Sequence, residues 1–129
     1  MTLSEAIASS RDRNLNFEDI RALAATYVGS TTNALDAIAL EIAHKYTTRQ
    51  VDFTAADALA NSMFAFAAQH GCLGDTLNSV FLAFDAGEFV NGSDPVGTDP
   101  EAKYTRSQIA EIIAAAARSN KSFEQSRGD

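Results

Sequence analysis

The stretch that decides the fold is FTAADALANSMFAFAAQ, residues 53–69. At helical spacing Leu59, Met63 and Phe66 share one face, whereas Phe64 points the other way. Few polar side chains interrupt this pattern: Asp57, Asn61, Ser62 and Gln69. A helix that is apolar almost all round is usually surrounded by other elements. The stretch therefore predicts a helix in the middle of the fold, capped by Asp52 or Thr54.

Helical spacing of apolar residues continues on both sides of this stretch, and strand-like alternation is absent from the sequence. Further helices are expected after Thr2, from Asn16 to Gly29, over about residues 32–46, from Asp75 to Gly87, and from Thr105 to about residue 119. Asp75 is expected to cap the fifth helix, and Gly87 to end it in a left-handed conformation. Residues 90–103 contain both prolines and two glycines, which predicts a loop.

These patterns predict an all-α fold, a compact bundle of five or six short helices with a long acidic loop before the last helix. The length fits a single helical domain over residues 1–119, and residues 120–129 are expected to form a polar, frayed C-terminal tail.

The charge is unevenly distributed along the chain. The net charge is -7, and residues 51–102 hold eight carboxylates without one Lys or Arg. Such a block attracts cationic partners and repels phosphate backbones, which argues against direct nucleic-acid binding. The sequence shows no apolar run of about 20 residues that would span a bilayer. The lone Cys72 excludes an intramolecular disulfide, so a cytoplasmic protein is expected.

The main hypothesis is a small acidic protein-interaction module that binds a basic protein or a second copy of itself. Phe89 and Val90 fall outside the predicted helical stripes, beside acidic residues. Apolar anchors rimmed by one sign of charge are typical of protein interfaces. The expected partner-binding residues are Asp85, Glu88, Phe89, Asp94, Asp99 and Glu101. A solvated loop and a calcium site are the alternatives for the acids, and their spacing does not fit an EF-hand.

The second hypothesis is a bundle that binds a metal or small ligand between helices or across a dimer interface. Glu41 and His44 form a Glu-x-x-His pair, as in di-iron bundles, which need a second such pair. Asp57 and His70 complete the candidate ligands, and Asp57 is also expected to pair with Arg106 or an arginine of the second helix.

The pair His70 and Cys72 could support a thiolate nucleophile, but core and turn packing is the preferred interpretation. An enzyme with a dispersed site is the third hypothesis, which no motif supports, and no cofactor is expected.

The apolar Ala37 and Leu40 on the back of the third helix favour a homodimer.

Overall fold

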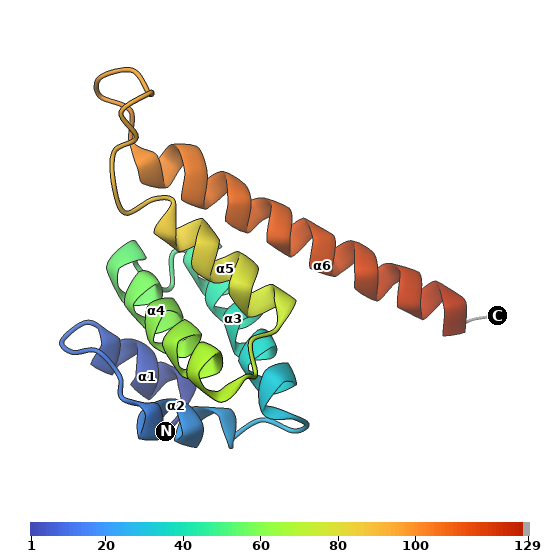
Figure 1. Cartoon of the computed structure of the whole chain (residues 1–129). Helices are drawn as coiled ribbons and strands as arrows, with labels where there is room; N and C mark the ends of the chain where they lie inside the picture. The colour runs from blue at the N-terminus through green and yellow to red at the C-terminus, as the bar shows by residue number, and fades with distance from the viewer. Residues whose placement is uncertain (128–129) are drawn as a thin grey trace.

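A computed structural model describes residues 1–127 of the chain, with side chains described for residues 1–119. Every regular element in this range is helical, which confirms the predicted all-α fold (Figure 1). The elements are α1 (Leu3–Ser10), α2 (Phe17–Ala24), α3 (Thr31–Thr47), α4 (Phe53–His70), α5 (Asp75–Asp85), the π-helical turn η1 (Glu101–Thr105) and α6 (Arg106–Arg127). Among the described helices, none combines the length and the apolar character that crossing a membrane requires.

Helix α4 lies in the middle of the bundle, as its apolar pattern predicts. It contacts α1, α2, α3 and α5. Leu59 and Met63 are completely buried, and Phe66 is nearly so. Asp52 caps the helix by accepting a hydrogen bond from the backbone N–H of Ala55, at 2.9 Å. Helix α5 contacts α3, α4 and α6, and α6 also contacts α3.

The N-terminus of α5 is capped from another helix. Gly74 occupies the N-cap position and offers no side chain, so the prediction that Asp75 caps this helix is wrong. Instead, the Asp36 carboxylate on α3 accepts a hydrogen bond of 2.9 Å from the backbone N–H of Leu77. A Cβ atom at Gly74 would lie 2.2 Å from a carboxylate oxygen of Asp36, so only glycine fits there. This bond ties α5 to α3 in one register.

The C-terminal end of α5 is joined to the start of α6 by a close contact. Gly87 has no left-handed backbone, so its predicted role as a left-handed cap is wrong. A Cβ at Gly87 would lie 2.1 Å from the hydroxyl oxygen of Thr105 and 3.2 Å from the Phe53 ring. The buried Thr105 hydroxyl donates a hydrogen bond of 2.7 Å to the carbonyl of Ala83. Glycine is therefore required here by space.

Two helix boundaries differ from those predicted. Helix α2 ends at Ala24, and residues 25–29 form turns rather than a further helical turn. The backbone of α6 is helical as far as Arg127, through most of the segment predicted to be a tail. Figure 1 shows the C-terminal half of α6 extending beyond the other helices.

The cap on α5 gives a stability prediction. Replacing Asp36→Ala removes the acceptor for the Leu77 N–H, so the free energy of unfolding should fall by about 1–2 kcal/mol. Asp36→Asn, which keeps one acceptor oxygen, should lose less. Chemical denaturation followed by circular dichroism measures both. Gly74→Ala should destabilise the native chain more than it destabilises the Asp36→Ala variant. Equal effects in the two backgrounds would contradict the close contact.

Candidate functional site

The structure uses one of the predicted partner-binding acids, Asp94, to fold its own loop. Its carboxylate forms an ion pair with Lys103 and accepts a hydrogen bond of 2.6 Å from the Tyr104 hydroxyl. The hydrogen bonds from Lys103 and Tyr104 lower the pKa of Asp94. This carboxylate is therefore already compensated within the chain.

Glu101 is also engaged within the chain. It accepts hydrogen bonds of 2.5 Å from the Tyr46 hydroxyl and 3.1 Å from the Arg106 guanidinium. Arg106 in turn stands over the Tyr46 ring, with its guanidinium carbon 5.0 Å from the ring centroid. Asp99 is exposed, and its carboxylate accepts a bond of 3.0 Å from the backbone N–H of Glu101. These contacts anchor the loop and the start of α6 to α3.

The structure places Glu88 and Asp85 beside Asp57, a residue the sequence analysis assigned to a different candidate site. Asn61, one turn after Asp57, donates a hydrogen bond of 3.3 Å to the Glu88 carboxylate. The predicted pairing of Asp57 with Arg106 or with an arginine of α2 is wrong, since Arg106 pairs with Glu101 and Arg21 on α2 contacts His70. One buried oxygen of Asp57 has no hydrogen-bond partner among the described residues.

The electrostatics of this carboxylate cluster are unusual for the chain. The pKa of Asp57 is raised to about 7, mainly by partial burial and in addition by a hydrogen bond with Glu88 and by the negative charges of Glu88 and Asp85. None of the ion pairs between described residues brings a Lys or Arg to these three carboxylates. At neutral pH the cluster can therefore hold a proton or accept a cation.

Aromatic rings continue the same seam between the two helices. Phe64 on α4 and Phe81 on α5 stack with their centroids 3.9 Å apart and their planes 11° from parallel. Helical spacing places Phe64 one turn after Asn61, and Phe81 one turn before Asp85. We call the surface made by these rings and the carboxylate cluster the α4–α5 face. Its residues are Asp57, Asn61, Phe64, Phe81, Asp85 and Glu88.

Exposed apolar side chains border this face. Phe89 is 77% exposed and Val90 is 71% exposed, and both follow Glu88 directly in the chain. Leu82 on α5 is also 50% exposed, but it lines a pocket with residues of α6 and lies outside this face. The sequence predicted Phe89 and Val90 for this role because neither fits a helical stripe. It gave no such signal for Phe64 and Phe81, since helical spacing of aromatic residues is also typical of core packing.

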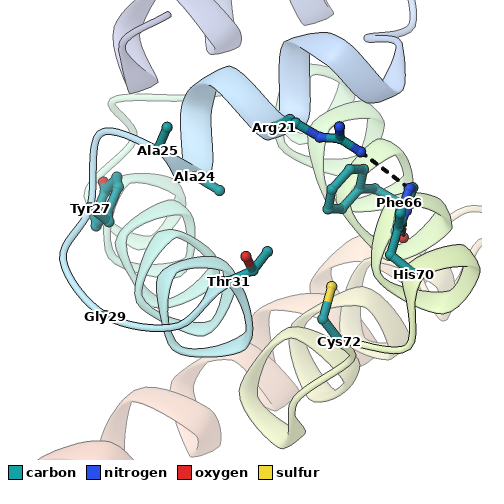
Figure 2. Close-up of a pocket in the computed structure, with 9 residues that line it drawn as sticks. All are labelled: Arg21, Ala24, Ala25, Tyr27, Gly29, Thr31, Phe66, His70 and Cys72. Atoms are coloured by element: carbon teal, nitrogen blue, oxygen red, sulfur yellow. Dashed lines mark hydrogen bonds between the residues drawn. The ribbon is translucent and has the colours of Figure 1, made fainter.

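The predicted metal or ligand residues do not converge. Glu41 accepts a hydrogen bond of 2.6 Å from the Tyr27 hydroxyl, and His44 is exposed on α3. Asp57 belongs to the α4–α5 face, and His70 lines a cavity at the far end of α4 (Figure 2). Within the described part of the chain, no group of three His, Cys, Asp or Glu side chains is arranged to hold a metal ion.

Comparisons with protein-family models, with curated protein sequences and with solved structures give no significant match. The geometry and charge of the residues themselves are therefore the basis for assigning a function.

The raised pKa of Asp57 gives a pH prediction for stability. Because folding raises this pKa from its ordinary value near 4 to about 7, the folded state holds the proton more tightly than the unfolded state. Stability should therefore fall as the pH rises from about 4 to about 7, and Asp57→Asn should remove that loss. We expect the variant to gain about 1–2 kcal/mol at pH 8, because water screens a partly buried carboxylate.

Urea denaturation of both proteins at several pH values between about 5 and 8 measures this difference. Glu88→Gln should move the midpoint of the pH dependence to lower pH, while the control Glu18→Gln, at an exposed site on α2, should leave it unchanged. A stability gain for Asp57→Asn that is the same at every pH would contradict the assignment.

Proposed function

We propose that the protein is a protein-interaction module whose α4–α5 face binds a lysine- or arginine-bearing segment of a basic partner protein. One observation carries the proposal. Asp57 and Glu88 lie together without a cation from the described chain, and one buried oxygen of Asp57 lacks a hydrogen-bond partner. A half-buried carboxylate without a compensating cation is costly, and a cation from a partner would relieve the cost.

The chemistry of the face favours arginine in particular. A planar guanidinium can donate two parallel hydrogen bonds to a carboxylate and can lie flat against aromatic rings. The carboxylates of Asp57 and Glu88 supply acceptors, and the stacked rings of Phe64 and Phe81 supply the aromatic surface. Phe89 and Val90, both largely exposed, offer apolar contacts next to them.

A second copy of the chain is the alternative partner, and helix α6 favours it. The backbone of α6 extends beyond the bundle (Figure 1), and its side chains Ala114, Ala115, Ala117 and Arg118 are exposed. A helix whose exposed side is rich in alanine can gain stability by packing that side on another surface. The exposed Arg118 supplies the positive charge that the α4–α5 face lacks.

The proposal predicts the effect of neutralising the face. The double variant Asp57→Asn, Glu88→Gln keeps the shape of both side chains but removes their charge. Affinity capture from native lysate, with salt-step elution and mass spectrometry, should recover a basic protein with the unmodified chain and not with the variant. With the purified partner, the dissociation constant should rise at least about tenfold, as expected for lost charge-assisted contacts.

The matched control is Asp12→Asn, Glu18→Gln, which changes the net charge equally at two exposed sites outside the face and outside α6. It should bind like the unmodified chain. Light scattering after size exclusion identifies the case in which the partner is a second copy, since only the face variant should then weaken the dimer. Identical capture by the face variant and by the unmodified chain would refute the proposal.

Binding should also release protons. A partner cation stabilises the ionised form of Asp57, whose pKa is about 7 in the free protein. At pH 7 we therefore expect the release of about half a proton per complex. Isothermal titration calorimetry in phosphate and in Tris measures it, because the two buffers differ in their heat of ionisation. Asp57→Asn should abolish the difference, and a binding heat independent of buffer for the unmodified chain would contradict the role of Asp57.

A further inference from the structure

A cavity of about 410 Å³ lies at the opposite end of α4 from the α4–α5 face. It is open to solvent on one side and is bordered by α2, by the turns that lead into α3, and by the end of α4 (Figure 2). Its lining includes Arg21, Ala24, Thr31, Phe66, His70 and Cys72. The volume falls in the range of small-molecule sites. Figure 2 shows Thr31 and the Cys72 sulfur facing the hollow, with Arg21 across it.

Arg21 is held in place by a neutral acceptor. Its Nη2 lies 3.4 Å from Nε2 of His70, and Nδ1 of His70 lies 2.9 Å from the carbonyl oxygen of Phe66. A guanidinium only donates hydrogen bonds and a carbonyl only accepts them. Nε2 of His70 must therefore accept from Arg21 while Nδ1 donates to Phe66, so the imidazole is neutral in this arrangement.

Ring packing fixes the His70 side chain in this orientation. Its ring stacks on the Phe66 ring, with the two ring centroids 4.3 Å apart. The Phe17 ring meets it edge-on, with the ring centroids 5.4 Å apart. The guanidinium carbon of Arg21 lies 5.9 Å from the centroid of the Phe66 ring. Because an acceptor without charge positions the guanidinium, Arg21 keeps its full positive charge at the cavity.

That charge is not compensated within the described residues. The ion pairs found there use Arg13, Lys103 and Arg106 as their cations, and none of them includes Arg21. Arginine has five N–H donors, of which the contact with His70 uses one. Thr31 is the first residue of α3, so the positive end of that helix also borders the cavity. Ala24 and Phe66 supply an apolar wall.

We infer that this cavity binds a small organic carboxylate. Arg21 pairs with the carboxylate group, and the apolar body of the ligand lies against Ala24 and Phe66. A planar carboxylate matches the guanidinium fork. An apolar wall beside a single cation suits a monoanion with a hydrocarbon body better than a phosphate, which needs several donors and little apolar contact. His70 is a positioning residue, because it acts on the ligand only through Arg21.

The test uses 3-phenylpropionate as the probe and 3-phenylpropanamide as its neutral counterpart. Titration of ¹⁵N-labelled full-length protein should give saturable shifts of the Thr31 and Cys72 amide signals, with a dissociation constant on the order of 1 mM for the acid. The amide should bind at least about tenfold more weakly, because it lacks the charge that Arg21 recognises. Cys72 is the only thiol in the chain, so slower alkylation by iodoacetamide reports occupancy independently.

Variants separate the role of Arg21 from a general effect of charge. Arg21→Gln should weaken binding of the acid at least about tenfold. The control Arg11→Gln removes the same charge from an exposed site outside the cavity and should bind normally. His70→Phe keeps an aromatic ring on Phe66 but removes the acceptor, so its affinity should fall between those of Arg21→Gln and the unmodified chain.

Three results would overturn the inference: equal binding of acid and amide, undiminished binding by Arg21→Gln, or equally tight binding of inorganic phosphate at the same amides. The comparison of acid and amide uses the unmodified chain, so it tests whether the cavity recognises the carboxylate even if a variant fails to fold. Asp57→Asn, Glu88→Gln should bind the acid normally, so this inference and the proposed function can fail independently.

Discussion

The packing of α4 against four other helices is the constraint on which the other features of the structure depend. A buried polar group must find a hydrogen-bond partner or lie at an edge of the core. Ser62 meets this requirement locally, by donating a hydrogen bond of 3.1 Å to the carbonyl of Ala58. Asp57 lies beside Asp85 and Glu88 at the end of α5, and His70 contacts Arg21 on α2. Both candidate sites therefore arise where the few polar side chains of one surrounded helix leave the core.

The acidic block separates into two kinds of carboxylate once the chain has folded. Asp94 and Glu101 fold the loop, because the bases and tyrosines near η1 reach them. Asp57 and Glu88 receive no such partner in the described chain, and partial burial favours the protonated form of Asp57. An uncompensated carboxylate pair lowers stability, and proteins retain such costs mainly at functional sites. This contrast distinguishes the α4–α5 face from the rest of the acidic surface.

The sequence predicted the features that local periodicity can encode. The helical class, the central position of residues 53–69 and the irregular placement of Phe89 all follow from side-chain spacing along one segment. The cap that Asp36 supplies to α5, the close approach of Thr105 to Gly87 and the neighbourhood of Asp57 and Glu88 do not. Each joins positions far apart in the chain, so it depends on how the helices pack. For the same reason the sequence could not distinguish among the acids of the loop. Which of them pairs with a Lys or Arg depends on the path of the loop in the folded chain.

The two sites differ in how the backbone supports their charges. The positive end of a helix stabilises an anion mainly within its first turn, and Asp57 lies in the second turn of α4. The helix therefore compensates its carboxylate only weakly, and an external cation would stabilise the fold as it binds. Arg21 contacts His70, the last residue of α4, where free carbonyls favour a cation. The cavity can thus keep its charge when empty, and an anion entering it would lie between Arg21 and the positive end of α3. Under the two proposals, binding at the face would relieve a cost of folding, whereas the cavity would already be organised before a ligand entered it.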